Sequence, residues 1–162
     1  MTLIEKKIKI NASPLNIWTF LEDVSNWHKY LENIKKAEII SDGGYEKGAL
    51  IRFLVDYFGV TYQLISEITE FEKNKKIAWK SIKGPKTRGS WTLKQLSDGT
   101  TGVTLVTEYE IPGSIIGKFF DKSIANDIAS KNIEFALKNL KKEVYYHRTR
   151  FGKNRIDNTT NS

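Results

Sequence analysis

Between residues 34 and 110, apolar and polar residues alternate with a period of two, which is typical of β-strands with one buried face. Turn-forming residues divide this region into six strands, which we expect at residues 34–41, 49–57, 60–71, 76–82, 88–96 and 101–110. Because each connection is too short for a helical crossover, neighbouring strands should pair antiparallel. Residues 3–11 alternate in the same way, so a seven-stranded antiparallel sheet is predicted.

Two other regions carry helical signals. Ser13 followed by Pro14 is typical of a helix start, and Asp23 offers a second one, so two short helices are expected before residue 34. Ser114 predicts the start of a long helix that runs to about Tyr146. At helical spacing this helix has two apolar sides, one with Ile115, Phe119, Ile133, Leu137, Leu140 and Val144, the other with Phe120, Ile124, Ile128 and Phe135.

Strand alternation also predicts which side chains face the interior. The inward set, read strand by strand, is Ile51, Phe53, Val55 and Tyr57, then Tyr62, Leu64, Ser66 and Ile68, then Ile77, Trp79 and Ser81, then Gly89, Trp91 and Leu93, then Val103, Leu105, Thr107 and Tyr109. Many of these residues are aromatic. Several carry a hydroxyl or indole N–H that can bind a small molecule in an apolar pocket, among them Tyr57, Tyr62, Tyr109, Trp79, Trp91, Ser66, Ser81 and Thr107.

Composition narrows the class of protein. The chain has 162 residues, which suits one domain at residues 1–146 followed by a basic, disordered tail at residues 147–162. No apolar run approaches the roughly 20 residues of a spanning helix, and the start carries no apolar signal segment, so a soluble cytoplasmic protein is expected. Cysteine is absent, which excludes disulfides, thiolate metal sites and cysteine nucleophiles. We expect neither a metal nor a cofactor.

The net charge of +7 is spread unevenly. The tail holds four basic residues against one acidic residue, a net +3, which leaves +4 for the domain. Charge alone therefore favours a weak contact between the basic C-terminus and an anionic membrane, whereas RNA binding would also need an exposed aromatic platform that the pattern does not provide. The second apolar side of the long helix must also be shielded from water, either within the same chain or by a second copy of it, so the sequence is compatible with a monomer and with a homodimer.

Several segments match a known family in order and spacing. They are residues 10–18 (INASPLNIW), 27–30 (WHKY), 77–79 (IAW), 89–93 (GSWTL), 99–104 (GTTGVT) and 136–141 (ALKNLK). Over about residues 3–146 the chain resembles the START-like (SRPBCC) superfamily, specifically its polyketide cyclase/dehydrase and lipid-transport branch. The resemblance implies an α+β helix-grip fold, in which a curved antiparallel sheet wraps around the long C-terminal helix. It also implies a deep cavity between them, with its mouth near the two small helices.

Combined with the alternation, the resemblance predicts a ligand-binding cavity. The residues expected to line it are Trp27, Tyr30, Phe53, Val55, Tyr62, Leu64, Trp79, Trp91, Leu105, Tyr109, Phe119, Phe120, Ser123 and Asp127.

Candidates for chemistry are few. Histidine is the side chain best suited to act as a general base near neutral pH, but no residue at a suitable spacing orients His28, which favours a surface position for it. Some family cyclases use an arginine or an acid in the pocket to orient and enolise a polyketone. Here Arg88 is out of register with Gly89 and Trp91, so it should point away from the interior, whereas Asp127 is the carboxylate most worth locating. No catalytic residue is assigned.

Three functions follow from these patterns and from the resemblance, which alone implies the second. The first is binding or transport of a hydrophobic small molecule, such as a lipid, a quinone or a polyketide-like ring compound. The second is a cyclase or dehydratase that acts on such a ligand. The third is an interaction protein whose basic tail docks on an anionic membrane or RNA. Because large inward aromatics occur without a catalytic constellation, binding is the function we expect first.

Overall fold

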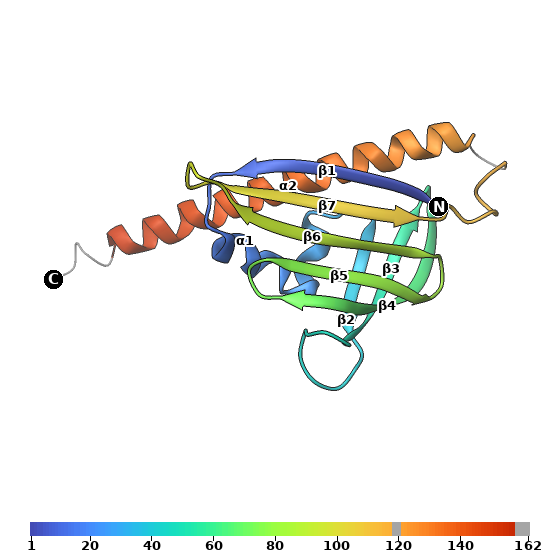
Figure 1. Ribbon diagram of the computed structural model, residues 1–162, viewed down its shortest axis with the longest axis horizontal. Coiled ribbons are helices and arrows are strands. Elements are labelled where there is room, and N and C mark those ends of the chain that lie inside the picture. Colours follow the sequence, from blue (N-terminus) through green and yellow to red (C-terminus); the bar gives the residue numbers. More distant parts are fainter. Residues whose placement is uncertain (118–120, 158–162) are drawn as a thin grey trace.

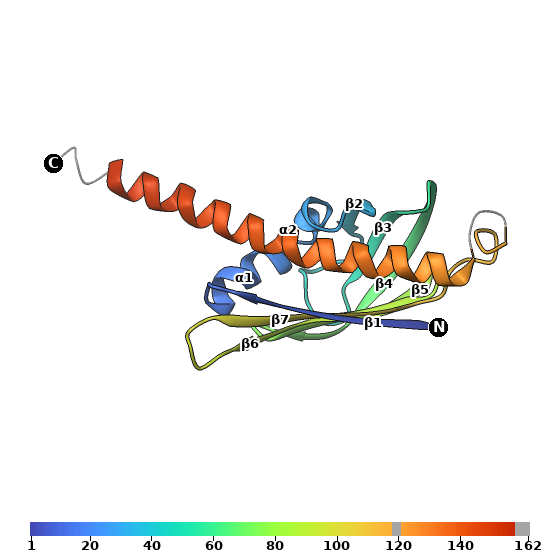
Figure 2. The same ribbon diagram turned by 90° about the horizontal axis from the view of Figure 1, so that it is seen from above.

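A single curved sheet forms one side of the molecule, and a long helix lies across its concave face (Figures 1 and 2). The computed structural model describes residues 1–117 and 121–157. The seven strands follow the order β1-β7-β6-β5-β4-β3-β2, and every neighbouring pair is antiparallel. Their bounds are β1 (Thr2–Ile10), β2 (Ile34–Ile39), β3 (Leu50–Tyr57), β4 (Val60–Glu72), β5 (Lys76–Lys83), β6 (Thr87–Gln95) and β7 (Thr101–Tyr109). The predicted meander is confirmed, with ends shifted by one or two residues.

The register shows that the predicted inward residues share one face. Phe53 lies opposite Leu64, Ser66 opposite Ser81, and Trp91 opposite Leu105. Since side chains alternate across a strand, these pairings place the whole predicted set on the concave side. Outward positions carry ion pairs instead, such as Arg88 with Glu108.

Both short helices begin where the sequence predicts. Helix α1 (Pro14–Leu21) is capped by Ser13, whose hydroxyl accepts the N–H of Asn16 at 3.2 Å. Asp23 caps the second segment, η1 (Val24–Lys29), which is a short 3₁₀ helix. Both segments bury an aromatic anchor, Trp18 in α1 and Trp27 in η1. They cover one end of the sheet next to α2 (Figure 1).

The long helix α2 (Lys122–Asp157) differs from the prediction at both ends. It begins at Lys122 rather than Ser114, because Gly117 has a φ of +84°, which no right-handed helix can include, and because Asp121 caps the N–H of Ser123 at 2.8 Å. Its C-terminal end continues to Asp157, so residues 147–157, which belong to the tail predicted to be disordered, are helical. Residues 158–162 lie outside the described residues.

The middle of α2 is anchored in the core. Leu137, Leu140 and Val144 are buried against the sheet and the short helices, as the first apolar side predicts. Beyond them, the hydroxyl of Tyr145 accepts the N–H of Asn11 at 3.2 Å. On the second apolar side, Ile124 and Phe135 are exposed. The last turns of α2 extend past the sheet (Figures 1 and 2).

Candidate functional site

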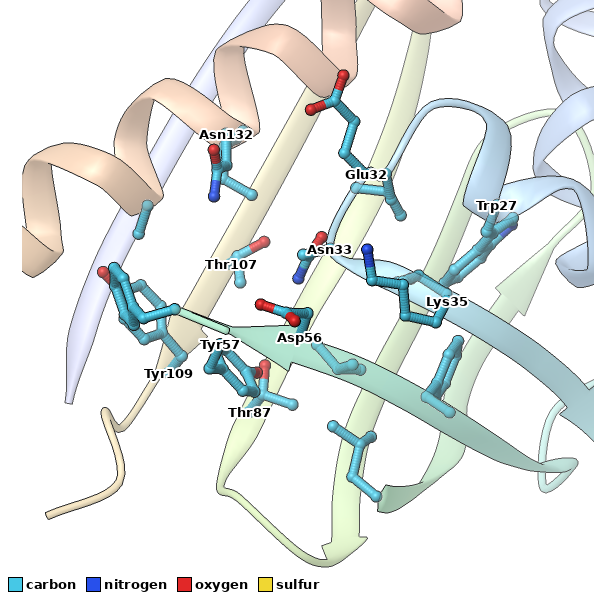
Figure 3. Close-up of a pocket in the computed structure, with 18 of the residues that line it drawn as sticks. Trp27, Glu32, Asn33, Lys35, Asp56, Tyr57, Thr87, Thr107, Tyr109 and Asn132 are labelled. Atoms are coloured by element: carbon cyan, nitrogen blue, oxygen red, sulfur yellow. The ribbon is translucent and has the colours of Figure 1, made fainter. Parts of the chain in front are cut away.

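A cavity of about 370 Å³ lies between the concave face of the sheet, helix α2 and residues 31–35. Figure 3 shows how its labelled side chains converge from these elements. Volumes of this order are typical of sites that enclose drug-sized molecules. Its lining consists of Trp27, Leu31, Glu32, Asn33, Ile34, Lys35, Phe53, Val55, Asp56, Tyr57, Phe58, Leu64, Ser66, Trp79, Thr87, Thr107, Tyr109, Ile111, Ile128, Ala129, Asn132 and Ile133.

One side of the cavity, here called the tryptophan side, is formed by Trp27, Phe53, Leu64, Ser66 and Trp79. The Trp27 and Phe53 rings stack with centroids 5.8 Å apart, and the Trp79 ring meets Trp27 edge-on at 5.6 Å. The indole N–H of Trp27 donates to the backbone oxygen of Leu21 at 3.0 Å, which fixes that ring. This side therefore presents rigid, mostly apolar walls.

Trp79 can lie against the sheet because its neighbour on β6 has no side chain. Gly89 is paired with Trp79, and a Cβ at residue 89 would come within 2.6 Å of the Trp79 ring and 2.5 Å of the carbonyl oxygen of Val106. Gly89 thus leaves the space that the indole occupies, and the shape of this wall depends on it.

Hydroxyl groups gather on the opposite side, where Figure 3 places Tyr57, Thr87, Thr107 and Tyr109 together. The hydroxyl of Tyr109 donates to the side-chain oxygen of Asn126 at 3.2 Å, which ties the sheet to α2. Burial, together with a smaller effect of the neighbouring Tyr109, raises the pKa of Tyr57 to about 12, and burial also raises the pKa of Tyr109. Both groups stay neutral at physiological pH, so they offer hydrogen bonds without charge.

The charged lining residues lie at the rim. Glu32, Lys35 and Asn132 are exposed, while Asn33 and Asp56 are half-buried. In Figure 3 these five side chains border the space between residues 31–35 and helix α2. Asp56 also accepts the N–H of Gly59 at 2.8 Å and so fastens the turn between β3 and β4. The cavity is therefore apolar and hydroxyl-lined inside, with a polar opening.

The turn between β3 and β4 supplies one further lining residue in an unusual conformation. Phe58 has a φ of +55° and Gly59 a φ of +82°, as a two-residue hairpin turn requires. A bulky aromatic residue rarely adopts positive φ, because its Cβ crowds the backbone. Phe58 adopts this conformation in spite of its steric cost, and its side chain forms part of the cavity wall.

Six residues of the predicted cavity set line this space: Trp27, Phe53, Val55, Leu64, Trp79 and Tyr109. Tyr30, Trp91 and Leu105 are instead fully buried in the core beneath it, because neighbouring side chains cover them on the concave face. Tyr62 turns toward the loop after β7, where its hydroxyl is 2.9 Å from that of Ser114. Phe119 and Phe120 lie outside the described residues.

The two polar helix residues of that set, Ser123 and Asp127, are exposed and do not line the cavity. The helix turns Ile128, Ala129, Asn132 and Ile133 toward the cavity, and Asp127 falls on the other side of the helix. This orientation leaves the carboxylate in water, where its charge is not desolvated.

The other candidates for chemistry also lie elsewhere. His28 is exposed, and its Nδ1 is 2.7 Å from the backbone oxygen of Ser25, so it does not reach the cavity. Arg88 points outward to Glu108, as its register predicts. In the described part of the chain, no three potential metal-ligating side chains lie together.

Sequence reasoning missed the rim. Because Val55 and Tyr57 are the predicted inward residues, alternation puts Asp56 on the solvent side of its strand, and nothing pointed to Glu32, Asn33, Lys35 or Asn132. Thr87 could have been found, because it lies two positions before Gly89 and therefore shares the inward face of β6. The rim residues could not, because their positions depend on where the sheet edge meets the helix.

The sheet curved around a long helix, with a cavity between the two, defines a helix-grip protein. The chain belongs to the family described as polyketide cyclase/dehydrase and lipid transport, whose model matches residues 1–145. This confirms the resemblance noted in the sequence. No match to a curated protein reaches significance.

Solved structures share the fold at low sequence identity. A Thermus thermophilus protein is 19% identical, covers 90% of this chain and 99% of its own, and has a TM-score of 0.72. A START superfamily protein from Mycobacterium smegmatis is 17% identical over 89% of this chain and 97% of its own, with a TM-score of 0.71. A Streptomyces aromatase/cyclase is 18% identical over 89% of this chain and 93% of its own, with a TM-score of 0.70. Among the helices described, none is long and apolar enough to cross a membrane.

Tyr57 predicts how the stability of the fold depends on pH. Its folded-state pKa of about 12 exceeds the usual 10.0, so neutral Tyr57 stabilises the fold fully below pH 10 and this contribution is lost as pH rises toward 12. We expect Tyr57→Phe to lose less stability than the wild type between pH 10 and 12, measured by urea unfolding at each pH. Equal losses in both proteins would show that Tyr57 ionises normally.

Proposed function

We propose that the protein binds a hydrophobic small molecule in the cavity between the sheet and α2, as a carrier or ligand-binding module. The observation that supports this most directly is the cavity itself, which combines about 370 Å³ of space with aromatic walls and a polar rim. A concave space of this size with mostly apolar walls and a few polar groups is the usual form of a small-molecule site. Covering about 300 Å² of apolar ligand surface would contribute roughly 7 kcal/mol before the costs of ordering are subtracted.

A cyclase or dehydratase function is the alternative that the family name suggests. Such chemistry needs a group that can take or give a proton at neutral pH and that reaches the substrate. Among the described lining residues, the carboxylates and the amine belong to Glu32, Asp56 and Lys35, all at the rim, and burial raises the pKa of Tyr57 away from neutrality. We therefore favour binding over catalysis.

Filling the cavity should abolish binding. Ala129 lines it from helix α2, so Ala129→Trp would place an indole in the space that a ligand occupies. We expect the affinity for the neutral dye N-phenyl-1-naphthylamine, measured by its fluorescence increase, to fall at least tenfold. Native mass spectrometry of gently purified wild type, followed by organic extraction, would identify any ligand carried from the host.

Lys131→Trp is the matched control, because Lys131 is exposed two positions further along the same helix and does not line the cavity. It should bind the dye like the wild type. A wild-type protein that binds no dye and carries no extractable molecule would overturn the proposal. So would unchanged dye affinity in a folded Ala129→Trp variant, because the dye would then be bound elsewhere.

A further inference from the structure

Two aromatic side chains lie exposed on the outer side of helix α2. Phe135 and Tyr146 are 54% and 62% exposed, whereas Leu137, Leu140 and Val144 of the same turns are buried against the sheet and the short helices. Eleven residues make about three helical turns, so the two rings lie on one line along the helix. Packing within the domain does not account for these rings, because the core holds the opposite side of the same turns.

Two lysines occupy the same side of the helix between these rings. Lys138 and Lys142 are exposed three and seven positions after Phe135, which is the spacing of neighbours on one helix face. The ammonium nitrogen of Lys138 lies 5.9 Å from the centre of the Phe135 ring and 2.9 Å from a carboxylate oxygen of Glu134. We call Phe135, Lys138, Lys142 and Tyr146 the outer patch. Its rings and lysine stems are apolar, and the lysine ends carry positive charge.

The positive charge of the protein is concentrated in the same part of the helix. Helix α2 has nine basic and four acidic residues, a net +5 out of the +7 of the whole chain. Residues 122–137 are neutral overall, so all of the +5 belongs to residues 138–157. The last turns of this helix extend past the sheet (Figures 1 and 2). The outer patch and the basic residues therefore follow one another on a single straight element.

The partner of this segment must be anionic and must accept partly buried rings. A second copy of the chain fits poorly, because pairing the outer patches would bring together two helices of net +5. Single-stranded RNA fits poorly as well, because successive bases stack on neighbouring aromatic side chains, whereas Phe135 and Tyr146 are about 16 Å apart along the helix axis. An anionic bilayer meets both requirements, since its phosphates attract lysines and its interface takes up aromatic rings.

We propose that helix α2 docks on an anionic lipid surface through the outer patch and the basic segment 148–155. The helix then lies along the surface, with Phe135 and Tyr146 inserted at the level of the headgroups and the basic residues next to the phosphates. Both contributions are needed, because stable attachment to a membrane combines apolar insertion with electrostatic attraction. The inference goes beyond ligand binding and does not depend on it, since the outer patch does not line the cavity.

The test is sedimentation of the full chain with vesicles, either of phosphatidylcholine alone or of equal parts phosphatidylcholine and phosphatidylglycerol. We expect binding to the anionic vesicles only, and weaker binding when the salt concentration is raised from about 0.05 M to about 0.5 M. Lys138→Gln combined with Lys142→Gln should weaken binding at least tenfold, because each basic residue next to an anionic surface contributes about fivefold. Phe135→Ser should weaken it at least threefold through the loss of insertion.

Matched controls lie on the convex face of the sheet. Lys80→Gln combined with Lys94→Gln makes the same change in net charge at two exposed lysines of β5 and β6. Ile82→Ser removes an apolar side chain that is 56% exposed, as Phe135 is 54% exposed. Each control should bind the anionic vesicles within twofold of the wild type, and urea unfolding of every variant shows that it is folded.

Several results would overturn the proposal. The wild type might sediment with neither kind of vesicle, or the outer-patch and control variants might lose binding equally, which would assign any attraction to net charge alone. Retention of poly(U) without vesicle binding would make RNA the partner. Conversion of a dimer to a monomer by Phe135→Ser in analytical ultracentrifugation, with vesicle binding unchanged, would make the patch a contact between two copies. Binding of the naphthylamine dye is measured separately, so failure of docking leaves the proposed ligand binding standing.

Discussion

Trp91→Ala is expected to cost about 3–5 kcal/mol of stability, the usual range for removing a fully buried indole. Trp91 is completely inaccessible on the concave face of β6, where it lies opposite Ile77 and Leu105 and meets Tyr30 edge-on with centroids 6.0 Å apart. Its loss would leave a void beneath the cavity that these neighbours cannot close. Urea unfolding, with midpoint and slope compared to the wild type, measures the cost.

Trp91→Phe should behave very differently, losing less than about 2 kcal/mol. The indole N–H of Trp91 is buried without a hydrogen-bond partner among the described residues, so phenylalanine removes an uncompensated polar group while keeping most of the apolar volume. Trp27→Phe is the matched control, since the N–H of Trp27 is bonded to Leu21 and its removal leaves a carbonyl oxygen unpaired. A larger loss in Trp91→Phe than in Trp27→Phe would contradict this expectation and point to a buried water at the Trp91 nitrogen.

Gly89→Ala is expected to cost about 2–3 kcal/mol and also to weaken binding of the naphthylamine dye at least threefold. The added methyl would overlap the carbonyl oxygen of Val106, which is backbone and cannot turn aside, and the rigid ring of Trp79. The overlap with Val106 strains the strands, and relief of the overlap with Trp79 requires the indole to move into the cavity, where it takes space from the ligand. Stability is measured by urea unfolding and affinity by dye fluorescence.

Gly102→Ala makes the matching change on the adjacent strand β7. There the nearest atoms to the new Cβ are the Lys94 oxygen at 3.7 Å and the Leu96 methyls at 3.8 Å, which is ordinary contact. With no strain added and a less flexible unfolded chain, this variant should be neutral or gain up to about 1 kcal/mol. If the two alanine variants have the same stability, Gly89 does not make room for Trp79.

The sheet could be predicted almost completely, because the alternation of apolar and polar residues shows which side chains face inward and so restricts how neighbouring strands can pair. Once Phe53, Leu64 and Trp79 are placed on the inward face, their short turns leave one way to pair the strands. The helix ends were harder. Ser114 is a typical N-cap residue, yet the helix begins only after Gly117 and Asp121, and no apolar pattern indicates that it extends through residues 147–157.

The candidate site was predictable from alternation only where it belongs to the sheet. Phe53 and Trp79 were found because inward parity and aromatic character are visible in the sequence, and Ser66 because it shares their parity. Trp27 lies in η1, and it was placed at the cavity by the family resemblance. Asp127 was misplaced because the rotation of α2 is set by Leu137 and Leu140, more than two turns away. Rim residues such as Asn132 depend on how three elements meet, which no local pattern encodes.

Two segments of helix α2 are under different evolutionary constraints, one from packing in the core and one from the shape of the cavity. Residues 137–144 hold the fold together, whereas residues 128–133 border the cavity and carry little of the core. Substitutions in the cavity segment can therefore reshape the space at small cost to stability, while those in the anchoring segment cannot. A protein divided in this way can change its ligand by substitutions in a single segment of the helix. Because such substitutions cost little stability, they do not depend on earlier stabilising substitutions elsewhere.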